Sequence, residues 1–394
     1  MAWIQPAFQD TKTSLSNPPP LARAHHTLTW LPGSLNDLES KDSRRKCAVL
    51  IGGANRETLL ADTHVLSHQD GQWKWEELRL APSGSRNALT PRARHSAVAI
   101  QGKLFVFGGI GGGEAVFSLD VEAKRWLRLK TTGRGPCARF AHAATSVQNI
   151  MYIIGGHTGT WFVNDVFCLD TLTRRWSQVH IQSSVRLPPS LHWTACTVMG
   201  SKILVFGGAL GTPLEDAYVL RQPDRASAES NERALENMSL SAQSSANEAA
   251  GKPPSPRYQH SCTLTFDANA ASDSSVRLCI MGGFGYTSQS SFDNASAVEE
   301  ARMRVAGPLK DVFIFDVRLR TWSEAKIAGE ALPPLWRHAA FSRASQPSEL
   351  IIFGGTRRKR DHNENEFPPT FEDCNEIWRL DSTWESPTQA LLSM

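Results

Sequence analysis

The sequence of 394 residues predicts an all-β fold built from six repeated units. Three observations support this prediction. Six Gly-Gly pairs each end a short apolar run, an Arg-x-x-His element precedes most of these pairs, and an Asp followed by a Trp comes after most of them. Because the three signals recur in a fixed order along the chain, they favour one repeat architecture over several unrelated domains.

Each glycine pair closes an apolar run such as LFVFGG or LIIFGG. A continuous apolar run that ends at glycine is typical of a strand buried on both faces, and glycine lets the backbone leave that strand sharply. We therefore expect a structural role for all of these glycines. The pairs are Gly52 and Gly53, Gly108 and Gly109, Gly155 and Gly156, Gly207 and Gly208, Gly282 and Gly283, and Gly354 and Gly355.

The second signal is the Arg-x-x-His element ahead of the pair. It occurs as Arg23/His26, Arg92/His95, Arg139/His142 and Arg257/His260. The fourth and sixth repeats lack the arginine, and alignment places Pro189 and Leu335 at its position.

The third signal is an Asp that ends a strand and is followed six residues later by Trp126, Trp176 or Trp322. An Asp at this position starts a tight turn by accepting hydrogen bonds from backbone amides further along. A Trp in the strand that follows buries a large ring, so we expect each of these residues to pack between neighbouring sheets.

Four short strands per repeat, with a period somewhat above fifty residues, resemble the kelch repeat. This resemblance implies a six-bladed β-propeller that occupies residues 1–394 as a single domain. The expected blades are about 21–80, about 90–130, about 136–181, about 188–255 with a low-complexity insert at 222–255, about 256–327, and about 333–385.

The last repeat is expected to borrow a strand from the start of the chain. Asp381 and Trp384 are only three residues apart, whereas Trp3 precedes the first Arg-x-x-His element. We predict that residues 2–8 supply the outer strand of the last blade, which closes the ring and removes an exposed sheet edge.

The insert at 222–255 is rich in Ser, Ala, Asn and Glu. It holds too few apolar residues to offset the cost of ordering the chain, although a weak outer strand near 238–240 remains open. We accordingly expect deletion of residues 226–248 to change stability little.

Long excursions between Gly283 and Asp311, and between Gly355 and Glu376, are expected on the face that also carries the loops between blades. Loops on a rigid scaffold often carry function, so this face is the predicted partner surface. The second excursion begins with four cations that form either a locally neutralised loop, a contact for an acidic partner or a nuclear import signal. These cations are Arg357, Arg358, Lys359 and Arg360.

Two roles are open for the repeated Arg and His side chains. They could hold acidic peptide side chains at the mouth of a central channel, because guanidinium groups bind carboxylates in bidentate fashion. They could instead tie one blade to the next, which their recurrence favours. The candidate residues are Arg92, Arg139 and Arg257 with His95, His142 and His260.

No pattern of catalytic or metal-ligating residues emerges. The twelve His form no HExxH motif, and the glycine-rich GGIGGGE segment opens no helix that would cradle a phosphate. We expect no enzyme activity, no cofactor and no metal. A net charge of +3 is too weak to predict nucleic acid as the main partner.

Seven Cys without a CxxC pair suggest reduced thiols, and the sequence shows neither a secretory leader nor an apolar run of the ~20 residues that a membrane span needs. We expect a cytoplasmic or nuclear protein with no membrane association. The leading hypothesis is a monomeric scaffold or adaptor that binds a protein or peptide. A constitutive subunit of a cytoskeletal or ribonucleoprotein assembly and a divergent enzyme that uses the central channel are the alternatives.

Overall fold

The all-β prediction is confirmed: no described residue lies in a helix, and consequently no described helix could cross a membrane. The computed structural model describes residues 2–4, 18–31, 47–56, 58–69, 72–80, 87–181, 187–190, 192, 194–198, 202–210, 212–213, 217–221, 232–238, 253–266, 276–286, 306–317, 319, 321–325, 328–329, 332–343, 346–359 and 370–381.

Antiparallel sheets follow one another along the chain, each with its strands in sequence order from the inside outward. The first contains β2 (Thr27–Leu31), β3 (Cys47–Ala54), β4 (Leu59–Gln69) and β5 (Gln72–Glu77). The second contains β6 (Ser96–Ile100), β7 (Lys103–Phe107), β8 (Val116–Asp120) and β9 (Arg125–Arg128). A later sheet of the same form contains β21 (Ser261–Phe266), β22 (Val276–Met281), β25 (Val312–Asp316) and β26 (Thr321–Glu324).

Two sheets have additional strands. An eight-stranded sheet joins β10 (Ala143–Val147), β11 (Ile150–His157), β12 (Phe162–Asp170) and β13 (Arg175–Ile181) to β14 (Thr194–Val198), β15 (Lys202–Phe206), β18 (Ala217–Arg221) and β19 (Glu232–Met238). A five-stranded sheet contains β28 (Ala339–Arg343), β29 (Gln346–Phe353), β32 (Ile377–Asp381), β1 (Ala2–Ile4) and β27 (Ala328–Gly329).

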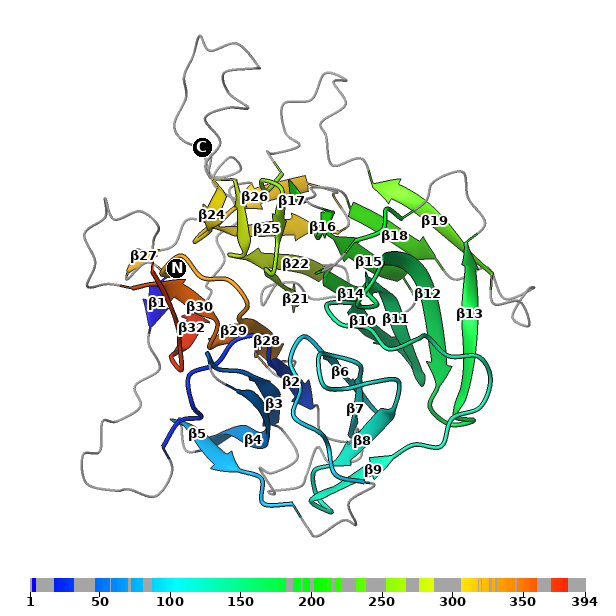
Figure 1. The fold of residues 1–394 in the computed structure, drawn as a ribbon. Coiled ribbons are helices and arrows are strands. Elements are labelled where there is room, and N and C mark those ends of the chain that lie inside the picture. Colours follow the sequence, from blue (N-terminus) through cyan, green and yellow to red (C-terminus); the bar gives the residue numbers. More distant parts are fainter. Residues whose placement is uncertain are drawn as a thin grey trace.

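The sheets are arranged around a common centre, with β2, β6, β10, β14, β21 and β28 on the inside (Figure 1). Each of these inner strands contacts the next one, and β28 contacts β2. Inner strands such as β6 and β10 alternate buried and half-buried residues, whereas the second strand of a sheet is buried on both faces, as in Cys47–Gly53 of β3. This difference explains why only the second strands form continuous apolar runs.

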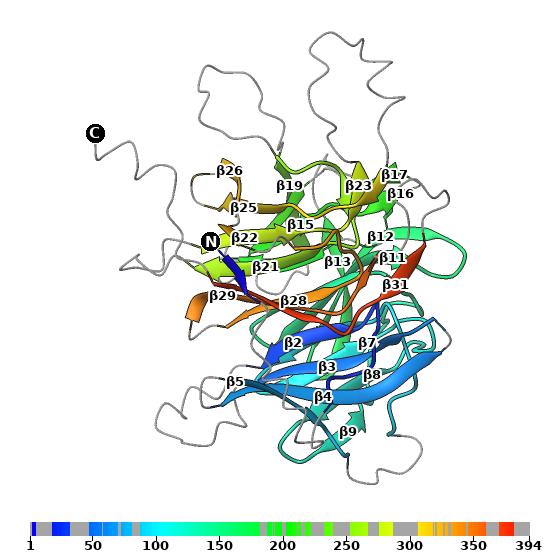
Figure 2. The same ribbon diagram turned by 90° about the vertical axis from the view of Figure 1, so that its left-hand side faces the viewer.

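Short strands after the glycine pairs lie outside these sheets. They are β16 (Ala209–Leu210), β17 (Thr212–Pro213), β23 (Phe284–Tyr286), β24 (Ala306–Pro308), β30 (Thr356–Arg358) and β31 (Phe371–Asp373). A further short strand, β20 (Arg257–Tyr258), lies just before β21 and pairs with β23. The labelled ones among them, β16, β17, β23 and β31, gather on the right-hand side of the molecule in Figure 2. The segments after the glycine pairs therefore share one face.

Buried Trp rings fill the interfaces between successive sheets. Trp126 packs in one cluster with Cys47 and Val49 of the preceding sheet, and the ring of Trp322 lies 5.7 Å from Phe206 of the preceding one. Between the first and the last sheet, the ring of Trp75 lies 4.9 Å from that of Phe353. Each Trp therefore joins its own sheet to the one before it, and Trp75 joins the first sheet to the last.

The two predicted irregular strands differ in their bounds from the expectation. β1 spans 2–4 and pairs antiparallel with β32, while residues 5–8 lie outside the described part. β19 spans 232–238, a few residues before the expected 238–240, and pairs with β18. Four of its seven residues are polar, so no continuous apolar run marks this strand in the sequence.

A parallel contact recurs at the outer strands. The segment after β9 pairs in parallel with β13 at Thr132 and Arg175, the end of β13 pairs with β19, and β27 pairs with β1. In each case the chain that leaves one outer strand runs beside the outer strand of the next sheet. β19 and β1 thus occupy the same position in their sheets as β13 does in its own.

Candidate functional site

Four buried arginines form hydrogen bonds to backbone carbonyls at the start of their repeats. Arg23, Arg92, Arg139 and Arg257 are at most 2% exposed. Each Nε donates to the carbonyl two residues earlier, and each Nη1 donates to the carbonyl of the first glycine of the pair in the same repeat. The arginines therefore hold the chain entering the inner strand against the chain leaving the second strand.

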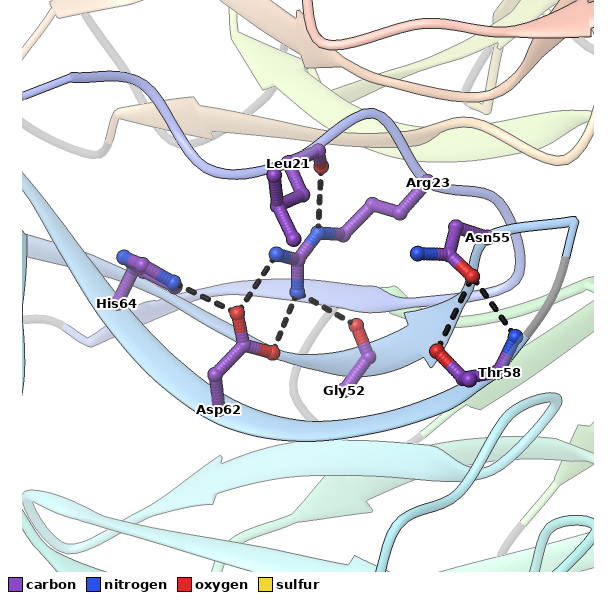
Figure 3. Close-up of polar contacts among 7 residues, drawn as sticks. All are labelled: Leu21, Arg23, Gly52, Asn55, Thr58, Asp62 and His64. Atoms are coloured by element: carbon purple, nitrogen blue, oxygen red, sulfur yellow. Dashed lines mark hydrogen bonds and ion pairs between the residues drawn. The ribbon is translucent and has the colours of Figure 1, made fainter.

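Three of these arginines also bind a carboxylate. Arg23 donates from Nη1 and Nη2 to the two oxygens of Asp62, each at 2.7 Å, and the ring of His64 reaches Asp62 at 2.8 Å (Figure 3). Burial alone would raise the pKa of Asp62, but the hydrogen bonds from His64 and Arg23 outweigh it and hold that pKa below its usual range. The equivalent partners are Asp165 for Arg139 and Asp311 for Arg257.

Arg92 has Thr90 where the other arginines have a carboxylate. Its Nη2 donates to Thr90 Oγ1 at 2.9 Å, and its guanidinium lies 5.1 Å from the ring centre of Phe117. Without an opposite charge, burial lowers the pKa of Arg92 to about 10. This pKa still leaves the group charged at neutral pH.

The buried histidines link each repeat to the one before it. Nε2 of His95 lies 3.0 Å from Thr27 Oγ1, and Nε2 of His142 lies 2.8 Å from Ser96 Oγ. Nε2 of His26 lies 3.1 Å from the carbonyl of Phe353, which belongs to the last repeat. Burial, followed by the charge of Arg23 or Arg139, lowers the pKa of both His26 and His142 to about 3, so these rings are neutral.

His95 and His260 are buried in the same way, and burial holds the pKa of each well below its usual value. The predicted site residues of the Arg-x-x-His elements are thus brought together inside the molecule. Their exposure is at most 7%, and the arginine donors bond to internal carbonyls and carboxylates.

Six residues near the start of the inner strands were missed by the sequence analysis, and five of them lie directly before a buried histidine. These residues share a positive φ between 54° and 63°, which is uncommon for residues other than glycine. We call them the central ring. It consists of His25, Arg94, Ala141, His192, Gln259 and Arg337.

Backbone hydrogen bonds join successive members of the central ring. The amides of Arg94, Ala141 and His192 donate to the carbonyl of the preceding member at 2.7–3.0 Å. The amide of His25 donates to the carbonyl of Arg337, and the amide of Arg337 donates to the carbonyl of Gln259. Between His192 and Gln259 the contact is made by side chains, with the two Nε2 atoms 2.9 Å apart.

The fourth repeat corrects the predicted alignment by one residue. The amide of the second glycine in each repeat donates to the carbonyl at the arginine position of the next repeat, as Gly109 does to Arg139. In the fourth repeat this acceptor is Ser190, not Pro189, and His192 therefore belongs to the central ring and not with the buried histidines. Leu335 was placed correctly, since it accepts from Gly283.

Gly108 shows why these close approaches need glycine. A Cβ added there would lie 2.5 Å from the carbonyl oxygen of Arg139 and 2.8 Å from Cε1 of His142, and φ is +64°. Any side chain at this position would displace the next repeat.

The central ring carries positive charge without an ion-paired carboxylate. Burial, followed by the charge of Arg337, lowers the pKa of Arg94, and burial also lowers the pKa of Arg337, against the opposing charge of Asp373. Burial and these two arginines keep the pKa of His25 well below its usual value. Among the described residues, neither guanidinium forms an ion pair, and Arg337 Nε donates to Gln259 Oε1 at 3.2 Å.

Within the cluster at 357–360, the charge of Arg357 is balanced by carboxylates of this chain. Arg357 pairs with Glu372 at 2.9 Å and with Glu376 at 2.7 Å, and β30 places it beside β31. Arg358 and Lys359 are half-buried, whereas Arg360 and most of the two long excursions, at 287–305 and 360–369, lie outside the described residues.

A shallow cavity of about 680 Å³ opens at the outer edge of β4 and β5. Its lining includes Pro18, Asp62, Trp75, Glu76 and Lys124, so acidic and basic groups are mixed. Lys124 Nζ lies 3.9 Å from Glu76 Oε1. Within the described part of the chain, no group of three or more His, Cys, Asp or Glu could hold a metal ion.

Comparison with known proteins identifies related chains. Residues 42–268 match the family model described as the KLHDC2/KLHL20/DRC7 Kelch-repeats domain. The serine/threonine-protein phosphatase BSL2 of Arabidopsis thaliana is 27% identical over 341 residues, which cover 84% of this chain and 30% of that protein. Kelch domain-containing protein 3 of Homo sapiens is 30% identical over 165 residues, covering 40% of this chain and 43% of that protein.

The Rab9 effector protein with kelch motifs of Xenopus laevis is 26% identical over 203 residues, covering 49% of this chain and 51% of that protein. The chain thus spans about half or less of the length of these relatives.

Proposed function

We propose that this chain, which belongs to the family of KLHDC2/KLHL20/DRC7 kelch-repeats domains, is a non-enzymatic module that binds a protein or peptide on the face of the central ring. Kelch-repeat domains generally mediate protein–protein interactions, and one relative is named an effector of Rab9. The phosphatase relative is a longer protein of which this chain spans 30%, so its name gives this region no phosphatase activity.

The scaffold that we propose is a six-bladed propeller whose ring is closed at the last blade by β1. Three features support it. The inner strand β2 contacts β28, β1 pairs with β32, and backbone and ring contacts join the first repeat to the last through Arg23 with Gly355 and Trp75 with Phe353. Closure of this kind removes exposed sheet edges and holds the loops of one face in fixed positions.

The observation that carries the functional proposal is the positive charge of Arg94 and Arg337 at the central ring. Arg94 and Arg337 are half-buried, and each lacks an ion-paired carboxylate among the described residues. The positive φ of the ring residues is a strained conformation, which is often found at binding sites. An acidic group from a partner would relieve the repulsion between these charges, because guanidinium groups bind carboxylates strongly when water is partly excluded.

Within this proposal the protein works as a monomeric adaptor in the cytoplasm, or in the nucleus, with no direct contact to nucleic acid. A constitutive subunit of a larger assembly is the second candidate. It would use the same face, but would co-sediment with a large complex instead of exchanging partners.

The test uses a phage-displayed library of random 12-residue peptides selected on the immobilised full chain. We expect enrichment of peptides that contain Asp or Glu, and loss of that enrichment in the double variant Arg94→Glu/Arg337→Glu. Arg125→Glu is the matched control, because Arg125 is exposed at the turn on the opposite face. Enrichment that survives the double variant but disappears in Arg125→Glu would place the binding surface on the opposite face.

A further inference from the structure

Large apolar side chains are exposed beside the central ring, in segments that follow three successive glycine pairs. Trp161 is 72% exposed, and the others are about 40% exposed. We call them the apolar ridge. It consists of Ile110, Trp161, Phe162 and Leu210.

A chain of ring contacts connects the apolar ridge to the central ring. The guanidinium of Arg94 lies 5.9 Å from the ring centre of Phe140, which lies 5.0 Å from His157. His157 in turn contacts Phe162 at 4.9 Å. Ile110 is also close to the central ring, because it forms a β-bridge with Ala93, the neighbour of Arg94. These contacts connect Arg94 to Phe162 and place Ile110 beside the central ring.

The position of Trp161 is fixed by the turn that presents it. The amide of Thr158 donates to the carbonyl of Trp161 at 3.0 Å, and the amide of Trp161 donates back to Thr158 Oγ1 at 3.1 Å. The amide of Gly159 donates to His157 Nδ1 at 3.0 Å. The indole itself makes no ring contact or hydrogen bond with a described residue. The turn fixes the backbone that presents this exposed indole, which lowers part of the entropy cost of binding.

We propose that the apolar ridge receives a large apolar side chain of an acidic partner peptide, whose carboxylate lies at Arg94 of the central ring. The inference rests on the proposed function and adds the partner's chemistry: an acidic residue next to a Leu, Met, Phe or Trp. Charge complementarity supports it, since Arg94 has a positive charge with no ion-paired carboxylate in the described part of the chain.

A single-stranded nucleic acid could also stack on Trp161. Such partners, however, need a groove with many phosphate contacts. The surface described here offers two unpaired arginines at the central ring and four apolar side chains. A peptide with one or two acidic groups fits this balance better than a chain with a phosphate at every step.

The experiment compares the selected peptide consensus for the wild type with that for Trp161→Ser. Leu172→Ser is the matched control, because Leu172 is 62% exposed in the same repeat, in the turn between β12 and β13 on the opposite face. Enriched peptides are then synthesised with a fluorescent label, and their affinity is measured by polarisation. Melting temperatures of all variants check that the fold is unchanged.

We expect the peptides enriched on the wild-type protein to combine Asp or Glu with a large apolar residue. Their affinity should be at least ~10-fold weaker for Trp161→Ser and unchanged for Leu172→Ser. A wild-type consensus with acidic residues alone, or equal affinity of the peptides for Trp161→Ser and the wild type, overturns the binding role of the apolar ridge. The proposed function would still stand. No enrichment on the wild type overturns both. Tighter binding of a labelled dT12 oligonucleotide than of every enriched peptide would replace the peptide with a nucleic acid.

Discussion

The bracing role of the buried arginines can be tested at Arg257. This side chain is fully buried and donates hydrogen bonds to Ser255, Gly282 and Asp311. Arg257→Met leaves the carbonyl of Gly282 and the carboxylate of Asp311 without their partner. Because unpaired buried groups keep their full desolvation cost, we expect a loss of about 3–5 kcal/mol in the free energy of unfolding.

The loss is measured by guanidinium chloride unfolding followed through Trp fluorescence. The double variant Arg257→Met/Asp311→Leu should lose less than the sum of the two single changes, by about 1–3 kcal/mol, since it removes the stranded charge. Lys310→Met, an exposed neighbour, should stay within about 0.5 kcal/mol of the wild type. A loss below about 1 kcal/mol for Arg257→Met would refute the bracing role and make this arginine available for partner binding instead.

Three further predictions concern pH, packing and the insert. The pKa of His142 is about 3 in the folded chain and ~6.5 when unfolded, so its stabilising contribution is complete above pH 6.5 and is lost as the pH falls towards 3. When the pH falls from 7 to 5, the free energy of unfolding should therefore drop by about 2 kcal/mol less in His142→Gln than in the wild type, as measured by denaturant titration. Equal drops would contradict this. Trp126→Ala should lower the free energy of unfolding by about 3–5 kcal/mol, whereas Leu127→Ala, at an exposed neighbour, should lower it by about 0.5 kcal/mol or less. Deleting residues 226–248 removes β19, so the melting temperature should fall, contrary to what the polar composition of this segment suggested; an unchanged value would show that β19 adds no stability.

The sequence predicted the features that depend on side-chain composition. A second strand buried on both faces must be apolar throughout, so the runs before Gly53 and Gly355 could be recognised directly. A strand without a continuous apolar run leaves no such signal. β19 was therefore left only as an open alternative near 238–240, and the three-residue β1 was predicted only because the last repeat lacked a strand.

The candidate site was predicted less completely, for two physical reasons. The carboxylates that bind Arg23, Arg139 and Arg257 lie 39, 26 and 54 residues further along the chain, so no fixed spacing marks them. All but one of the junctions in the central ring are backbone hydrogen bonds, so most of its residue types differ from repeat to repeat. The position of five of its members directly before a buried histidine was the one signal that could have revealed it.

That construction has a consequence for how binding preference could change over time. Amides and carbonyls join most successive members of the central ring, so side chains such as those of Arg94 and Ala141 are not needed to hold it together. Exchanging Ala141 for a charged residue, or Arg94 for a neutral one, would alter the chemistry of the central ring and leave the scaffold unchanged. Molecules with this architecture could thus acquire new partners one residue at a time.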